Sequence, residues 1–335
     1  MPDIFVEPDY VFEDDKNNIV WLHRNQRSIW NANLSLQALG SWTENHPDPL
    51  LNRTFGGLIT SDKLLKTDKS KLKTSKPQKS FLVSVYALTK QTETEEKWVE
   101  TIQQQAKVIK SKSRRERFIQ HKNWWNNFWE RSYIHISAQS EEEKSKVELV
   151  NQGYQLQRYI HACGGRGNSP IKFNGSIFTL DTENLPGKYN GYDADYRRWG
   201  GPYWWQNTRL PYWSMLNTGD FDLMQPLFKM YMDALPVRVH ATKKYFNHSG
   251  AHFPETMYFW GTYTDANYGR DREGKQDGIT ENGYIKRYWQ GGLEVSLMML
   301  DYYDITQDEV FAKVTLVPFV TEILTFYDEH WKRDE

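Results

Sequence analysis

The chain has 335 residues, enough for about two domains, and its 42 lysine and arginine residues balance 43 aspartate and glutamate residues to a net charge of -1. This balance provides no positive field that would attract a phosphate backbone, so we expect no nucleic-acid partner. Cys163 is the only cysteine, which excludes an intrachain disulfide framework and a cysteine zinc cluster.

Membrane and export signals are also missing from the sequence as it stands. No run of about 18 apolar residues occurs. Met1 is followed by Pro-Asp rather than by a basic and then apolar leader. We therefore expect no membrane span, find no signal peptide, and leave the localisation unassigned from the residues alone.

The N-terminal part of the chain carries short strand patterns. They lie at 18–22, at 55–59, where two glycines indicate a bulge or a close backbone approach, and at 80–88, where apolar and polar residues alternate. The Lys/Ser/Thr-rich stretch 61–80 is typical of a solvated loop. These strands are too few for a complete β-sandwich, so we expect only part of one.

From about residue 94 the pattern becomes helical. A charged helix-permissive stretch covers 95–131, and Ser140 to Glu143 forms a capping box that marks a helix start. Further helices are predicted at 203–217, 221–246, 285–304 and 308–331. Long Gly/Asn/Asp/Tyr-rich loops separate some of them, and loops of this length are usually functional. The sequence predicts a mainly α chain with an N-terminal β segment and one active face.

Aromatic residues make up 15% of the chain, with 14 tryptophans and 20 tyrosines. Their flat apolar faces and polar edges suit sugar rings, although scattered aromatics usually pack in cores. One cluster, 124–129, ends the charged helical stretch and is better explained by docking on a neighbouring domain. A second cluster, 199–213, lies among glycines and polar residues, and this setting favours sugar binding.

Several stretches together resemble a known family. They are QRYIHACGGRGNSPIKFNGSIF (157–178), NTRLPYW (207–213) and HKNWWNNFWERSYI (121–134). They resemble the catalytic-domain opening and the linker of glycoside hydrolase family 95, the α-L-fucosidase group. DYRRWGGPYWWQNTRLPYW (195–213) is closer still to the uncharacterised domain of unknown function 5703 group. The resemblance implies the C-terminal part of a β-sandwich at 1–92, a linker helix region at 93–137, and the N-terminal part of an incomplete (α/α)6 barrel at 138–335.

The resemblance also implies a catalytic pair. Glu255, in the Pro-Glu setting HFPETMYFW, corresponds to the general acid, and Asn207 to the second of two asparagines that hold the attacking water. The first asparagine is replaced by Trp205. The aspartate base of the family belongs to a later helix than those in this chain.

The residues themselves support the same acid. Glu255 lies between Phe253-Pro254 and an apolar run, a setting that raises a carboxyl pKa. The structural alternatives are a loop or capping glutamate, and an Asn207 that bonds its own backbone. His248, His252 and Glu255 have metal-like spacing, but Gly250 and Pro254 oppose the helix that such a site would need. We expect no metal and no cofactor.

The resulting prediction is an inverting, exo-acting glycoside hydrolase of the six-hairpin glycosidase type. The carbohydrate would be held by Trp204, Trp205, Gln206, Arg209, His252, Trp260 and Asn174. A non-catalytic carbohydrate-binding protein and a barrel-type glycoside phosphorylase remain as alternatives. Relatives of this kind imply a periplasmic or secreted location. An incomplete barrel would leave apolar surface exposed, so we also expect self-association.

Overall fold

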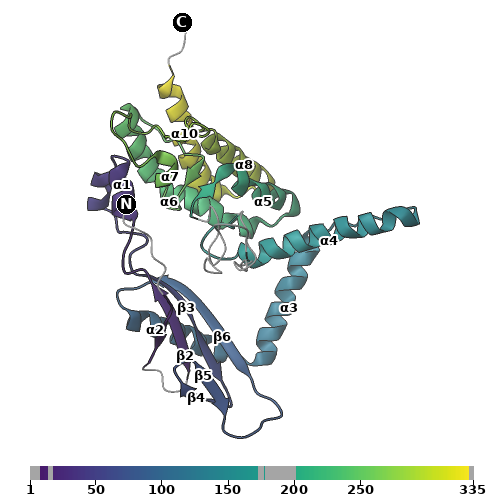
Figure 1. Cartoon of the computed structure of the whole chain (residues 1–335). Helices are drawn as coiled ribbons and strands as arrows, with labels where there is room; N and C mark the ends of the chain where they lie inside the picture. The colour runs from purple at the N-terminus through teal and green to yellow at the C-terminus, as the bar shows by residue number, and fades with distance from the viewer. Residues whose placement is uncertain (1–7, 14–17, 173–176, 178–200, 332–335) are drawn as a thin grey trace. The chain divides into compact units, whose positions relative to one another are not determined.

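The computed structural model describes residues 8–13, 18–172, 177 and 201–331 (Figure 1). The chain forms two compact units. The first consists of Met1–Ala32 and Thr43–Trp124, and the second of Asn33–Trp42 and Trp125–Glu335. Each unit is described by itself below. The short helices α1 (Trp30–Leu36) and η1 (Gly40–Glu44) lie between β2 and β3 in the sequence.

The first unit contains an antiparallel sheet in the order β1-β2-β3-β6, with β1 at Tyr10–Phe12, β2 at Ile19–Arg24, β3 at Arg53–Ser61 and β6 at Val83–Gln91. Strand β3 pairs with β6 along its whole length, from Arg53 opposite Gln91 to Ser61 opposite Val83. The glycines of β3 allow a close approach to Trp21, as the sequence predicted. A Cβ atom on Gly56 would lie 2.1 Å from the Trp21 carbonyl oxygen.

One sequence interpretation in this unit is wrong. The stretch 61–80, expected to be a loop, contains the antiparallel ribbon β4 (Leu64–Asp68) and β5 (Lys71–Thr74). Both strands are short and carry lysine, threonine or aspartate side chains on both faces, so the sequence shows no apolar face. Leu64 pairs with Thr74 and Lys66 with Leu72, and Leu65 is 55% exposed, so the ribbon forms without a buried core of its own.

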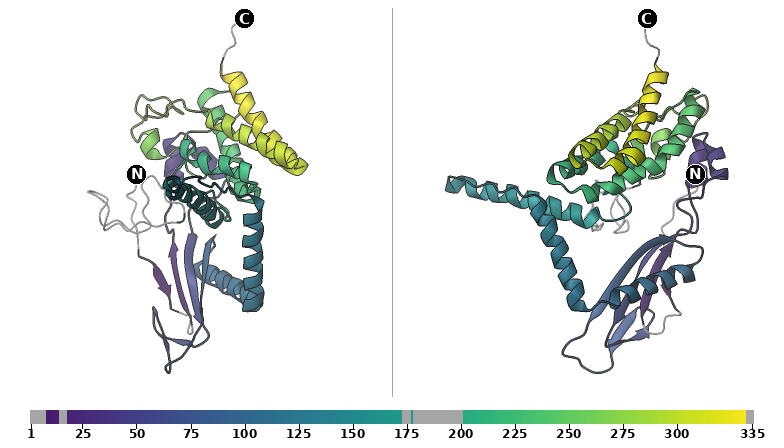
Figure 2. Two further views of the ribbon diagram at one scale, coloured as in Figure 1. Left: turned by 90° about the vertical axis from the view of Figure 1, so that its right-hand side faces the viewer. Right: turned by 180° about the vertical axis from the view of Figure 1, so that it is seen from behind.

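Helix α2 (Glu95–Lys110) covers one face of this sheet (Figure 2). Thr94 caps its first turn by accepting a hydrogen bond from the Lys97 N–H. Trp98, Ile102 and Ala106, spaced four residues apart on one face, are buried against the sheet. The sheet side of this core is formed by Val20, Leu22, Leu58 and Tyr86.

The helical stretch predicted at 95–131 is two helices, since α3 (Arg114–Arg131) begins after a break at Ser111–Ser113. The second unit then contains α4 (Glu141–Gly164), α5 (Trp205–Thr218), α6 (Phe221–Phe246), α7 (Asp265–Tyr268), α8 (Gly291–Thr306), α9 (Glu309–Phe311), the π-helix η4 (Ala312–Leu316) and α10 (Val317–His330). A two-stranded pairing joins β7 (Tyr203–Trp204) to β8 (Thr256–Met257). The chain therefore has an N-terminal antiparallel sheet followed by a mostly helical region, as predicted.

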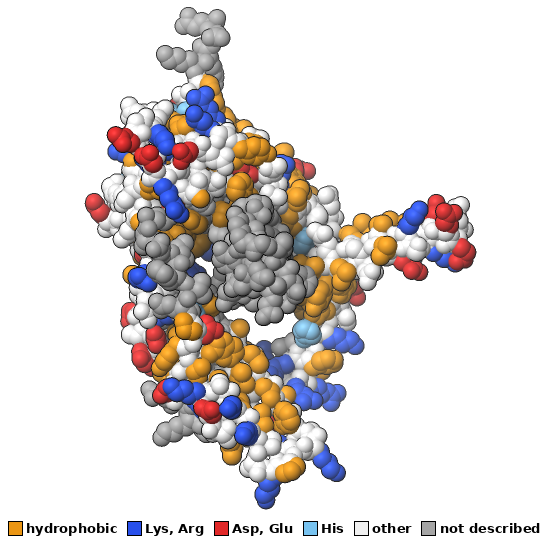
Figure 3. Space-filling view, viewed as in Figure 1, with side chains coloured by type: hydrophobic (Ala, Val, Ile, Leu, Met, Phe, Trp, Pro, Cys, Tyr) orange, Lys and Arg blue, Asp and Glu red, His pale blue; other side chains and the backbone are white. Residues whose placement is uncertain are grey.

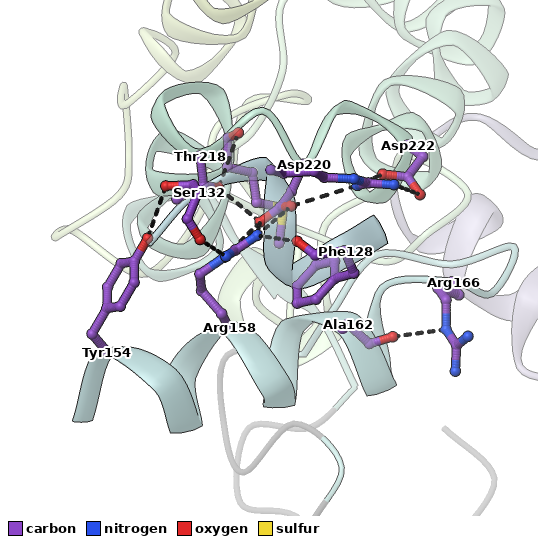
Figure 4. A network of polar contacts seen from close by, with 11 residues as sticks. Phe128, Ser132, Tyr154, Arg158, Ala162, Arg166, Thr218, Asp220 and Asp222 are labelled. Atoms are coloured by element: carbon purple, nitrogen blue, oxygen red, sulfur yellow. Dashed lines mark hydrogen bonds and ion pairs between the residues drawn. The ribbon is translucent and has the colours of Figure 1, made fainter. Parts of the chain in front are cut away.

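A buried ion network ties α4 to the start of α6 (Figure 4). Arg158 and Asp220 are 2% and 1% exposed, and Arg158 Nη2 lies 2.9 Å from Asp220 Oδ1. Thr218 donates to the other carboxylate oxygen at 2.7 Å, and Arg158 also donates to the Phe128 carbonyl at 3.2 Å. Burial of this kind is sustained only because every charged atom has partners.

Apolar side chains remain exposed on several helices. On α4 they include Leu149 and Leu156, at 67% and 51% exposure. Charged side chains gather at the N-terminal end of this helix, at the tip that projects to the right in Figure 3. Within the described residues, the helical run Glu309–His330 is apolar enough, by length and composition alone, to cross a membrane, with a mean hydropathy of 1.5. Core helices of soluble proteins meet the same criterion, and 33% of its apolar window is buried.

Candidate functional site

Glu255 lies where two segments distant in sequence meet. Strand β8 pairs with β7 in antiparallel register, with Thr256 opposite Trp204. The backbone N–H of Trp205 donates to the Glu255 carbonyl at 2.8 Å. This pairing places the glutamate directly beside the first turn of α5, whose amide N–H groups have no partners within the helix.

The Glu255 side chain is buried, with 1% of its surface exposed. Its Oε1 accepts the Gln206 N–H at 2.7 Å, while Oε2 has no hydrogen-bond partner in the described part of the chain. Loss of hydration on burial raises the pKa of Glu255 to about 7. The Gln206 N–H and the charge of Arg209 oppose this rise in pKa, and the charge of Glu294 adds to it.

Glu294, in the first turns of α8, was not found from the sequence. Its two oxygens accept hydrogen bonds from Trp205 Nε1 at 2.9 Å, Trp213 Nε1 at 3.2 Å and Arg209 Nη1 at 2.7 and 2.8 Å. The signal that could have indicated it is the preceding Gly291-Gly292 pair. A Cβ atom on Gly291 would lie 3.2 Å from the indole of Trp205, so the glycine permits close packing of α8 on α5.

Asn207 follows Gln206 and is exposed on α5. It lines a cavity of about 290 Å³ together with Gln157, Ile160, His161, Ile171, Lys172, Leu210 and Pro211. Burial lowers the pKa of Lys172 to about 7, and its Nζ donates to the carbonyls of Gly201 and Pro202 at 3.1 and 3.0 Å. Gln206 therefore connects the two predicted catalytic residues. Its backbone N–H binds the Glu255 carboxyl, and Asn207 is the next residue in the chain.

The predicted aromatic contacts separate into half-buried and fully buried rings. Trp204 and Trp260 are half-buried, and Trp260 stacks on Tyr258 with ring centroids 4.3 Å apart. Trp205 is 1% exposed and contacts Tyr231 edge to face at 5.7 Å. A ring buried on both faces has no surface for a sugar, so the structure places Trp205 among the packing residues that support Glu294.

The remaining predicted residues also differ in exposure. Gln206 is exposed and Arg209 half-buried. His252 is 1% exposed. It accepts from Arg238 Nη2 at 2.6 Å and contacts Thr242 Oγ1 at 3.0 Å through its other ring nitrogen. Burial lowers the pKa of His252 well below its usual value, so this ring is a neutral core group. Asn174 lies outside the described residues.

The three residues with metal-like spacing point to different partners. His248 Nε2 contacts His330 Nδ1 at 2.8 Å, whereas His252 binds Arg238 and Glu255 binds the α5 amide. Across the described ranges, no group of three or more His, Cys, Asp or Glu side chains converges.

A second buried carboxyl, Asp265, lies at the start of α7. Its Oδ1 accepts from Asn33 Nδ2 at 2.5 Å, and burial raises its pKa. Asn33 Oδ1 in turn accepts from Trp260 Nε1 at 3.3 Å and from Thr262 Oγ1. Asn33 therefore links Asp265 to the loop that carries Trp260, and the sequence offered no pattern that singled out Asp265.

Comparison with known proteins gives a family match and a likeness to solved structures. Residues 1–134 match the family model described as Domain of unknown function (DUF5703). They form a DUF5703 N-terminal domain. The linker motif at 121–134 lies at the end of this match, whereas the stretch 195–213, which carries the DUF5703 resemblance in the sequence, lies outside it. No curated protein matches the chain.

Among solved structures, the chain is similar to a putative kojibiose phosphorylase from human microbiome, with a TM-score of 0.57 and 13% sequence identity. The match covers 98% of this chain and 37% of that one. The chain therefore spans little more than a third of the length of that phosphorylase. At this identity the likeness shows a shared fold alone.

Proposed function

We propose that this chain is part of an enzyme that cleaves glycosidic bonds, with Glu255 as the general acid. The observation that carries the proposal is the state of the Glu255 carboxyl. It is buried, its pKa is raised to about 7, and Oε2 has no partner in the described residues. A protonated carboxyl with one free oxygen is what a departing sugar oxygen needs.

The reaction requires a proton at the leaving oxygen and a nucleophile at the anomeric carbon. Glu255 supplies the proton from Oε2, while the Gln206 N–H fixes Oε1 and so orients the carboxyl. In the inverting hydrolase that we favour, Asn207 positions the attacking water or a sugar hydroxyl. Gln206, Arg209, Trp204 and Trp260, which retain exposed surface, would contact the carbohydrate.

We also propose how the described elements belong to the domains of a larger enzyme. The sheet and α2 would belong to part of a β-sandwich at 1–92 with the adjoining linker region at 93–137, and the helices at 138–335 to part of an (α/α)6 barrel. The likeness to a phosphorylase over 98% of the chain supports this arrangement. Glycosidic bond cleavage by the whole protein is likewise part of the proposal.

The same likeness supports phosphorolysis as a second candidate. In that reaction phosphate replaces water as the nucleophile, and the general acid keeps its role. Arg209, the cation that acts on Glu255, is already bonded to Glu294 at 2.7 Å, and this pairing favours hydrolysis over phosphate binding beside the acid.

The test is product analysis with a panel of α- and β-linked disaccharides, with and without inorganic phosphate. Hydrolysis releases free sugar in both conditions, whereas phosphorolysis releases a sugar 1-phosphate only with phosphate. Glu255→Gln should abolish most of either activity. Glu273→Gln, which changes an exposed loop glutamate, is the matched control and should leave activity intact.

A carbohydrate-binding protein without activity would give a different result. It would bind one of the sugars in calorimetry, would release no product in either condition, and would bind equally well as the Glu255→Gln variant. That combination would reject the enzymatic proposal.

A further inference from the structure

One face of α5 is directed at a single carboxylate. Trp205, Arg209 and Trp213 follow one another at intervals of four residues, so their side chains lie along one side of the helix. All three donate hydrogen bonds to Glu294 of α8, at distances between 2.7 and 3.2 Å. Because three side chains of one helix bind both oxygens of one carboxylate, this contact fixes the position of α5 relative to α8.

The contact is connected to Glu255 through the first turn of α5. Trp205 donates its indole N–H to Glu294 and its backbone N–H to the Glu255 carbonyl. The next residue, Gln206, donates its backbone N–H to the Glu255 carboxyl. Any rotation of α5 that loosened Glu294 would also move the amide that orients Glu255.

We propose that Glu294 is a positioning residue for Glu255. It fixes the first turn of α5 against the acid and, with Arg209, forms a charge pair whose two members act on the acid with opposite signs. The inference rests on the proposed role of Glu255 as general acid. Glu294 touches no reacting atom in this scheme and acts only through α5 and through its charge.

Titratable groups from three elements lie around Glu255 and Glu294. Helix α5 contributes Arg209, helix α6 contributes Tyr231, and the segment before α8 contributes Tyr288, whose pKa is raised by burial and by the charge of Glu255. The tyrosines are neutral near neutral pH, so Arg209 and Glu294 provide the charges that act on Glu255. They act with opposite signs, since Arg209 lowers its pKa and Glu294 raises it.

The opposite signs provide a sharp experiment. The full chain is labelled with ¹³C at the glutamate side-chain carboxyl, and the Glu255 signal is assigned by its loss in Glu255→Gln. Its titration midpoint is then measured in the wild type and in the variants. Glu294→Gln should lower the midpoint and Arg209→Gln should raise it, each by about one pH unit or less because the two charges partly screen each other.

Two further variants separate charge from packing. Arg209→Lys keeps the positive charge but loses the planar contact, so its midpoint should stay close to the wild-type value. Asp304→Asn removes a charge from an exposed position on the same helix as Glu294 and should leave the midpoint unchanged. Structural disruption alone would shift Glu294→Gln and Arg209→Gln in the same direction.

Equal midpoints in all variants, or shifts of the same sign, would overturn the inference. If Glu294→Gln does not fold, the sign of the Arg209→Gln shift and the Arg209→Lys value still decide the charge role. Activity distinguishes this failure from failure of the proposed function. Midpoints that move as expected, with full turnover in Glu255→Gln, would reject the acid role and leave the charge pair intact.

Discussion

Gln206 donates its backbone N–H to Glu255 at 2.7 Å, so a carboxyl from the loop after α6 occupies the capping position at the start of α5. The helix amides favour a charged carboxylate there, yet burial outweighs them and raises the pKa of Glu255 to about 7. The two effects leave a carboxyl that is oriented by the helix and loses its proton only as the pH rises through about 7.

This balance predicts that folding stability depends on pH through Glu255. A carboxyl with a raised pKa binds its proton more tightly in the folded state, so its contribution to stability is lost as the pH rises from about 4.5 to about 7. The full shift corresponds to about 3 kcal/mol. We expect the unfolding free energy of Glu255→Gln to fall less than that of the wild type over this range, measured by urea denaturation. Parallel curves for the two proteins would contradict the raised pKa.

The buried ion network predicts a large and position-specific loss of stability. Asp220→Ala leaves the guanidinium of Arg158 buried without its carboxylate, and breaking such a pair typically costs about 3–5 kcal/mol. Asp222→Ala removes a neighbouring carboxylate that is half exposed and should cost less than about 1 kcal/mol. Chemical denaturation of both variants checks the difference, and similar losses would show that burial of Asp220 is not the cause.

The secondary structure of the helical region could largely be predicted because its signals are local. The Ser140–Glu143 pattern predicts the start of α4, although the Ser140 side chain makes no capping hydrogen bond to the helix backbone. The apolar periodicity of α6 and α10 likewise depends on neighbours along the chain. The β4–β5 ribbon was missed because its strands are polar on both faces. The expected helix at 285–304 begins later, at Gly291, after a turn that includes the Ile285 N–H to Asn282 carbonyl contact.

A site residue could be predicted only where its neighbours in the sequence also form its environment in the structure. The apolar neighbours of Glu255 in sequence are also its neighbours in space, since Phe253 and Met257 are buried with it. Glu294 and Asp265 gain their environment from helices and loops far away in the sequence. His252 and Trp205 were predicted to contact the sugar but are buried. Their local sequence does not indicate this burial, because the residues that enclose them are distant in the sequence.

Exposed apolar stripes on the last helices predict self-association. Leu293, Leu297 and Leu300 on α8 follow the spacing of one helix face, and Val310, Val314 and Val317 on α9 to α10 form a second stripe with the same spacing. All six side chains are exposed, by 37% to 70%. We expect concentration-dependent association in sedimentation velocity, weakened in a Leu297→Gln/Val314→Gln variant.

The matched control for this prediction is Leu65→Gln, which changes an equally exposed leucine on the β4–β5 ribbon. It should associate as strongly as the wild type. A wild-type chain that sediments as a single monomer at all concentrations would show that the stripes do not bind a second copy.

The proposed general-acid role of Glu255 predicts a dependence on the leaving group. The Gln side chain of Glu255→Gln keeps the shape of the acid and its reach but has no proton to give to a departing alkoxide, and such catalysis is typically worth about 10²–10⁴ in rate. The rate loss should be largest for natural sugars, whose leaving groups are basic, and small for aryl glycosides with acidic phenols, which leave without help. Sugar binding, measured by calorimetry, should change little, because the amide still contacts the glycosidic oxygen. The deciding comparison uses two substrates that differ only in the leaving group. Equal losses on both would mean that Glu255 acts on α5 as a structural cap and not as the acid.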